Sequence, residues 1–128
     1  MAFQVMIVDD SAAMRQFIAR VLVLSGLEVG SCIQASNGQE ALELLRTDWI
    51  DIVLTDINMP VMNGERLVCL MKADEVMRTI PVLVVSTDCS EHRVQRMMSL
   101  GAQGYLQKPF SPESLRQQME QLLGVCNA

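Results

Sequence analysis

The chain has 128 residues, half of them hydrophobic, and a formal net charge of -5 at pH 7. This length suits one domain over residues 1–128, with a core large enough to need no disulfide or structural metal. The acidic balance argues against direct nucleic-acid binding, and no apolar run approaches the roughly 20 residues of a membrane span, so we expect a cytoplasmic protein that does not insert into membranes.

The first half of the chain alternates strand-like and helix-like segments. Residues 5–8, VMIV, form a short apolar run typical of a strand buried on both faces of a parallel sheet. Ser11 can cap the helix that follows, where apolar residues recur at i, i+3 and i+4. The mixed segment 29–35 predicts an edge strand. Ser36 and Gln39 have capping-box spacing and predict the start of a second helix.

The second half of the chain continues this alternation. Ser111, Pro112 and Glu113 place a cap, a first-turn proline and an acid before the last apolar periodic segment. The predicted elements are, in order, a strand at 52–54, a helix around 67–71, a strand at 82–85, a helix from Ser90, an edge strand at 104–107 and a helix from Ser111.

Five strands alternating with five helices predict an α/β fold. Short connections favour a parallel sheet with right-handed crossovers and helices on both faces. With the second and fifth strands at the edges, the strand order is 2-1-3-4-5, which is the flavodoxin-like doubly wound arrangement. In such sheets ligands bind beyond the carboxyl ends of the strands, near the switch point between the first and third strands.

Polar side chains follow the strands at this predicted edge of the sheet. Three carboxylates flanking the switch point would repel one another unless a cation neutralised them. Ligands that are all oxygen suit Mg²⁺, with Mn²⁺ as an alternative. The residues are Asp9 and Asp10 after the first strand, Asp56 after the third, Ser86 and Thr87 after the fourth, and Lys108 after the fifth.

These side chains together predict a site for phosphoryl transfer. Lys108 could place its ammonium beside an anion at the rim, and Ser86 offers a hydroxyl donor on the same side. With a metal ion they would spread the charge of the transferring group, while Asp56 would be the attacking carboxylate. The expected product is an acyl phosphate on Asp56.

Four motifs resemble those of a known family. They are VDDS at 8–11, LTDINMPVMNG at 54–64, VVSTD at 84–88 and YLQKPFS at 105–111. In this order and at these intervals they resemble the receiver domain of two-component response regulators, most closely the stand-alone chemotaxis-type regulators. The resemblance covers essentially the whole chain.

The resemblance implies that Asp56 is the phosphoacceptor for a sensor histidine kinase or a phosphotransfer protein. It makes Asp10 a direct Mg²⁺ ligand, Asp9 a ligand through water, and the backbone carbonyl of Asn58 a further ligand. Such a protein is a signalling phosphoacceptor and promotes its own phosphorylation and dephosphorylation, but it is not a multi-turnover enzyme for an external substrate.

The resemblance also implies a switch. Ser86 and Lys108 would contact the phosphoryl oxygens, and the rotamer of Tyr105 would follow the state of Ser86. The output would be a changed affinity for a downstream protein at the face made by the fourth helix, fifth strand and fifth helix. The peptide bond before Pro109 is expected to be cis, as in relatives.

Three further residues stand where the family tunes the lifetime of the acyl phosphate: Asn58, Thr87 and Asp88. Thr87 is bulkier than the alanine or glycine often found there and could hinder access to the phosphoryl group. Ile57 and Asn63 depart from the aromatic and the acid of chemotaxis proteins, but these departures leave the phosphorylation site intact.

Other interpretations remain open at this point. A small phosphohydrolase also attacks phosphate with an aspartate, but its acid/base aspartate would stand where this chain has Asn58. A receiver-like binding module that is never phosphorylated, or a receiver trimmed from a larger regulator, would share every motif. Away from the site, we expect Trp49 and Phe110 to be packing residues and His92 to face solvent.

Overall fold

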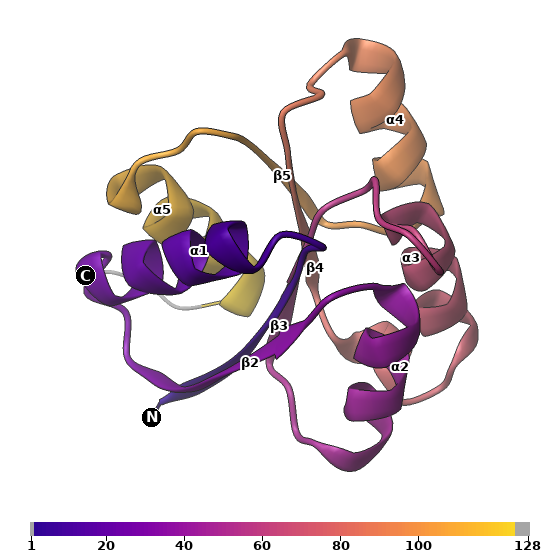
Figure 1. The fold of residues 1–128 in the computed structure, drawn as a ribbon, viewed down its shortest axis with the longest axis horizontal. Helices are drawn as coiled ribbons and strands as arrows, with labels where there is room; N and C mark the ends of the chain where they lie inside the picture. Colours follow the sequence, from indigo (N-terminus) through magenta and orange to yellow (C-terminus); the bar gives the residue numbers. More distant parts are fainter. Residues whose placement is uncertain (1, 125–128) are drawn as a thin grey trace.

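The computed structural model describes residues 2–124 as a five-stranded parallel sheet covered by helices on both faces (Figure 1). The strand order is β2-β1-β3-β4-β5, which confirms the predicted topology and both predicted edges. Figure 1 shows α1 and α5 on one face and α2, α3 and α4 on the other. The strands are β1 (Phe3–Val8), β2 (Val29–Ala35), β3 (Ile52–Thr55), β4 (Val82–Ser86) and β5 (Gly104–Gln107).

The helices begin where side chains can accept hydrogen bonds from free backbone N–H groups. As predicted, Ser11, Ser90 and Ser111 cap α1, α4 and α5. A short 3-10 helix, η1 (Met77–Thr79), was not predicted from the sequence. The α-helices are α1 (Ala12–Leu24), α2 (Gly38–Thr47), α3 (Gly64–Ala73), α4 (Glu91–Leu100) and α5 (Pro112–Leu123).

The predicted cap of α2 was wrong by one residue. Asn37, rather than Ser36, is the N-cap, and its Oδ1 accepts from the N–H of Glu40 at 2.9 Å. The carboxylate of Glu40, rather than Gln39, reaches back to the N–H of Ser36 at 3.1 Å. Asparagine caps helices as well as serine does, so the pair one residue further along can cap the helix, and its glutamate adds a charged acceptor for the N–H of Ser36.

Two hydrophobic cores lie on either side of the sheet, and β1 contributes to both. Met6 and Val8 face the core under α2, α3 and α4, whereas Val5 and Ile7 face the core under α1 and α5. Each of these four side chains is essentially inaccessible to solvent. Burial of a side chain of this size contributes roughly 1.5–3 kcal/mol, so the ends of the strand are held firmly in place.

The register of β1 against β3 positions the polar residues that follow them. Val8 pairs with Thr55, so the next residues, Asp9 and Asp56, leave the sheet side by side. The N–H of Asp56 donates to the carbonyl of Val8 at 2.9 Å. The same pairing that buries the two strands therefore brings two carboxylates to one edge of the sheet.

Among the aromatic residues, one prediction was wrong. The indole of Trp49 is 79% exposed and donates to Asp51 Oδ1 at 3.0 Å, so this residue does not pack in a core. Phe110 packs edge-on against Phe17, with ring centroids 5.9 Å apart, and His92 is exposed, both as predicted.

Cys32, Cys69 and Cys89 are free thiols, and Cys126 lies outside the described residues. No helix within residues 2–124 combines the length and the apolar character that a membrane crossing requires.

The loop after β3 contains a valine in a left-handed conformation. Val61 has φ 68° and is 83% exposed, so no packing contact offsets the steric cost of its branched side chain. We expect Val61→Asn to stabilise the protein by about 0.5–1 kcal/mol, because asparagine tolerates this conformation. Urea denaturation measures the change. The control is Val76→Asn, at a residue that is also exposed but has φ -86°; equal stabilisation by both variants would contradict this account.

Candidate functional site

Three carboxylates meet at the carboxyl ends of β1 and β3. One oxygen from each of Asp9, Asp10 and Asp56 lies within 4.8 Å of the others. Asp9 is buried, Asp56 is partly buried and Asp10 is exposed. The cluster is therefore open to solvent on one side, and its like charges repel one another strongly enough to favour a bound cation.

Lys108 brings the only ammonium that contacts this cluster among the described residues. Its Nζ lies 2.9 Å from Asp9 Oδ2 and 3.2 Å from Asp56 Oδ2. Burial disfavours the charged amine, but the hydrogen bond that Lys108 donates to Asp9 and the charges of Asp56 and Asp9 outweigh it, so the pKa of Lys108 lies above its ordinary value. Lys108 is consequently protonated throughout the neutral range.

Backbone N–H groups orient two of the three carboxylates. Asp9 Oδ1 accepts from the N–H of Ser11 at 2.9 Å, and Asp56 Oδ1 accepts from the N–H of Ile57 at 2.7 Å. Within the described part of the chain, the carboxylate of Asp10 has no hydrogen-bond or ion-pair partner. Asp10 is thus the carboxylate that gains most from a cation.

Gly64 packs closely against the backbone of the loop that carries Asp56. Its N–H donates to the carbonyl of Ile57 at 2.7 Å. A Cβ at Gly64 would lie 2.2 Å from the carbonyl oxygen of Asp56, so only glycine allows this approach. Gly64 ends the motif at 54–64, but this contact cannot be detected from the sequence, because it depends on how α3 begins against the end of β3.

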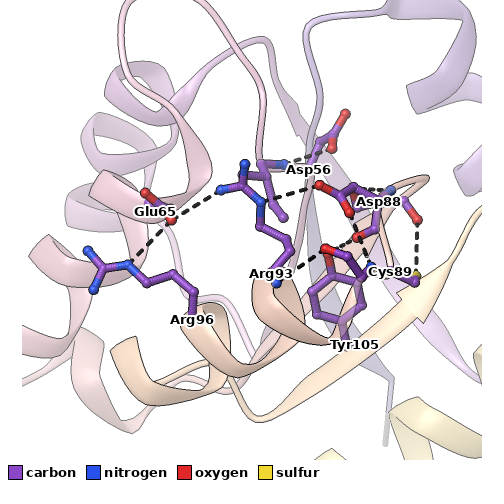
Figure 2. A network of polar contacts seen from close by, with 10 residues as sticks. Asp56, Glu65, Asp88, Cys89, Arg93, Arg96 and Tyr105 are labelled. Carbon is purple, nitrogen blue, oxygen red and sulfur yellow. Dashed lines mark hydrogen bonds and ion pairs between the residues drawn. The ribbon is translucent and has the colours of Figure 1, made fainter.

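Ser86 and Tyr105 both contact Asp88, in the loop between β4 and α4; Figure 2 shows Tyr105 beside Asp88. Ser86 is buried, and its Oγ accepts from the N–H of Asp88 at 3.1 Å. The hydroxyl of Tyr105 donates to the carbonyl oxygen of Asp88. Burial raises the pKa of Tyr105, partly opposed by a hydrogen bond with Ser86, so the phenol is protonated at neutral pH.

Lys108 and Thr87 border a small apolar cavity beside the carboxylates. The N–H of Lys108 donates to the carbonyl of Ser86 at 2.9 Å, which ties the end of β5 to the end of β4. The peptide bond between Lys108 and Pro109 is cis, as predicted. The cavity has a volume of about 280 Å³ and is lined by Met14, Phe17, Thr87, Lys108 and Pro109.

The structure brings together most of the residues predicted from the sequence. Asp9, Asp10, Asp56 and Lys108 form one contacting group, and Ser86, Thr87, Asp88 and Tyr105 lie on the neighbouring strand ends and loop. Asn58 is exposed, two residues after Asp56.

Sequence reasoning missed two arginines near this group. Arg15 donates from Nη1 to the carbonyl of Asp9 at 2.6 Å, and Arg93 forms ion pairs with Glu65 and Asp88. Neither arginine stands at a strand end, so no signal in the sequence singled it out.

The donor set fits a hard divalent cation. The convergent side-chain atoms of Asp9, Asp10 and Asp56 are all carboxylate oxygens, and the cluster contains no sulfur or imidazole ligand within the described residues. Mg²⁺ prefers such oxygen ligands and keeps several waters, which the open side at Asp10 allows.

Comparison with known proteins identifies the class of this chain. Residues 5–120 match the model of the response regulator receiver domain. Chemotaxis protein CheY1 of Helicobacter pylori is 34% identical over 95% of this chain and 98% of its own length. The structure of the chemotaxis response regulator CheY4 of Vibrio cholerae is 32% identical, with a TM-score of 0.85 over 96% of this chain and 100% of that chain.

A more distant structure shares the fold. The receiver domain of a sensor histidine kinase from Pseudomonas aeruginosa, solved with magnesium in its active-site cleft, is 20% identical, with a TM-score of 0.85 over 97% of this chain and 99% of that chain.

The chain therefore belongs to the response regulator receiver family, whose members are signalling proteins of two-component systems. Within that family it is a receiver domain of the chemotaxis, or CheY, type. Receivers of this type interact with histidine kinases and with downstream target proteins.

The unpartnered carboxylate of Asp10 leads to a stability prediction. We expect Asp10→Asn to stabilise the protein without metal by about 1 kcal/mol, because it removes one of three crowded charges. The same substitution should reduce the rise in melting temperature on adding Mg²⁺, because the metal then stabilises the folded state less.

Thermal unfolding with EDTA and with Mg²⁺ measures both effects. Glu75→Gln is the control, since Glu75 is an exposed acid far along the chain from this cluster, and it should change stability by less than about 0.5 kcal/mol. A lower melting temperature for Asp10→Asn in EDTA would argue against charge crowding.

Proposed function

We propose that this protein accepts a phosphoryl group on Asp56 from the phosphohistidine of a sensor histidine kinase or phosphotransfer protein, and that the modification switches its binding to a downstream protein. One observation carries the proposal: Lys108 Nζ contacts both Asp9 and Asp56 within an open cluster of three carboxylates. This arrangement suits the binding of a metal and a phosphoryl group together.

The transfer needs a nucleophile and a place for negative charge. A carboxylate oxygen of Asp56 attacks the phosphorus, and an O–P bond forms as the N–P bond to the donor imidazole breaks. The imidazole nitrogen keeps the electron pair and takes up a proton. The N–H of Ile57 orients the carboxylate, and the ammonium of Lys108 stabilises the phosphoryl oxygens.

Asp10 and Asp56 would hold the metal directly, with Asp9 acting through water and the backbone carbonyl of Asn58 as a further ligand. Mg²⁺ or Mn²⁺ bound there would neutralise charge on the phosphoryl oxygens. The side chain of Asp9 is 3% exposed and that of Asp56 is 18% exposed, so the deeper burial of Asp9 supports a water-mediated rather than a direct role. The magnesium in the Pseudomonas aeruginosa receiver, which has the same fold, supports this choice of metal.

The output depends on Ser86 and Tyr105. A phosphoryl group on Asp56 adds about two negative charges and new acceptor oxygens. The hydroxyl of Ser86 turns toward these oxygens, and Tyr105 then takes a new rotamer, which reshapes the face made by α4, β5 and α5. The downstream partner binds this face with a different affinity in the two states.

Phosphorylation with a small donor tests the proposal. After incubation with Mg²⁺ and acetyl phosphate, intact mass measurement should show the gain of one phosphoryl group, and Asp56→Asn should show none. Asp48→Asn is the matched control, because Asp48 is an exposed aspartate at the end of α2. No gain by the wild-type protein would indicate a binding module that is not phosphorylated, and rapid turnover of the donor would indicate a phosphatase.

Thr87 is expected to set the lifetime of the phosphorylated state. Thr87 lines the cavity beside Lys108, and we expect its side chain to restrict the approach of water to a phosphoryl group on Asp56. We predict that Thr87→Ala speeds the loss of phosphate severalfold, corresponding to roughly 1 kcal/mol of barrier. The decay of the phosphorylated mass in purified protein measures the rate, and an unchanged or slower decay would refute the prediction.

A further inference from the structure

A series of ion pairs links α3 to the loop between β4 and α4. Figure 2 shows the guanidinium of Arg93 between the carboxylates of Glu65 and Asp88. Arg93 Nη1 lies 3.2 Å from Glu65 Oε1, and its Nε lies 3.5 Å from Asp88 Oδ2. Arg96 Nε approaches the same oxygen of Glu65 at 3.5 Å but forms no ion pair with Asp88. Arg93 is therefore the residue that joins the two elements.

At one end of this series of ion pairs, Asp88 contacts both residues of the proposed switch. Its N–H donates to Ser86 Oγ, and its carbonyl oxygen accepts from the hydroxyl of Tyr105. Its carboxylate also accepts from the N–H of Ser90 at the start of α4. A shift of Asp88 would consequently move the hydrogen-bond partners of Ser86 and Tyr105 together.

At the other end, Glu65 is the second residue of α3. The first, Gly64, lies against the backbone of Asp56 and donates to the carbonyl of Ile57. Contacts thus run from the backbone of the proposed phosphoacceptor through Glu65, Arg93 and Asp88 to Ser86 and Tyr105. This route does not pass through Lys108 or through the carboxylate groups of the acidic cluster.

We infer that Arg93 is a positioning residue that holds Asp88, and with it Tyr105, in the resting arrangement. The inference rests on the proposed function in one respect, namely that Ser86 and Tyr105 form the switch. The side chains of Arg93, Glu65 and Asp88 are 30%, 27% and 43% exposed. Ion pairs of this exposure bias an equilibrium by a factor of roughly two to five, which is weak enough for phosphorylation to overcome.

The single tyrosine of the chain provides a direct reporter. In protein carrying ring-labelled ¹³C-tyrosine, one set of NMR signals reports on Tyr105. We expect Arg93→Gln without phosphate to change the ratio of the two Tyr105 states two- to fivefold toward that of wild type treated with Mg²⁺ and acetyl phosphate. Arg96→Gln, the matched control, should leave the signals in place.

A double-mutant comparison tests whether Arg93 acts through its ion pair with Glu65 or only through its charge. Glu65→Gln should move the Tyr105 signals as Arg93→Gln does, and the two substitutions together should move them no further. Unchanged signals in Arg93→Gln, an equal shift in Arg96→Gln, or additive shifts in the double variant would each overturn the inference.

Folding and phosphorylation are measured separately. Arg93→Lys retains a charge but cannot span both carboxylates, so it should give an intermediate shift, and it decides the question if Arg93→Gln fails to fold. Intact mass tests phosphorylation of the wild type by itself. A wild type that gains no phosphoryl group contradicts the proposed function. The Tyr105 signals of the unphosphorylated variants still test whether Arg93 positions Asp88 and Tyr105.

Discussion

The contact of one ammonium with two carboxylates is the interaction on which the site depends. Asp9 and Asp56 leave adjacent buried strands, so the pairing of β1 with β3 forces their charges together. Lys108, delivered by the end of β5, offsets that repulsion without closing the site, because Asp10 stays exposed and unpartnered within the described residues. The fold thus holds an excess of negative charge at an open edge of the sheet, where a cation would neutralise it.

The carboxylate cluster is held more rigidly than the loop that contains Asp88. The carboxylates stand at the ends of strands that are buried on both faces, and Gly64 fixes the loop of Asp56 through a backbone approach. The contacts around Asp88, by contrast, are single hydrogen bonds and partly exposed ion pairs. The carboxylates therefore keep their geometry, because buried strands hold them. The loop that contains Asp88 can change its arrangement at small cost in free energy, because weak contacts hold it.

Much of the site could be predicted from the sequence because its residues directly follow the strands. Asp9, Asp10, Asp56, Ser86 and Lys108 could be assigned to one edge from the alternation of strands and helices alone. The contacts of Gly64, Arg15 and Arg93 could not, because each joins elements whose relative placement depends on side-chain packing. The predicted cap of α2 was wrong because two neighbouring residues offered comparable caps, and the predicted packing of Trp49 was wrong because the indole lies at the surface beside Asp51.

The sequence by itself determined the strand order, the edges of the sheet and the composition of the acidic cluster, because hydrophobic periodicity and the residues after each strand are local properties that follow the backbone. Only the tertiary structure decided which oxygens Lys108 contacts, how closely α3 approaches Asp56, and that Arg93 bridges Glu65 and Asp88. Those features depend on distances between side chains from separate elements, which are set by the packing of both cores against the sheet.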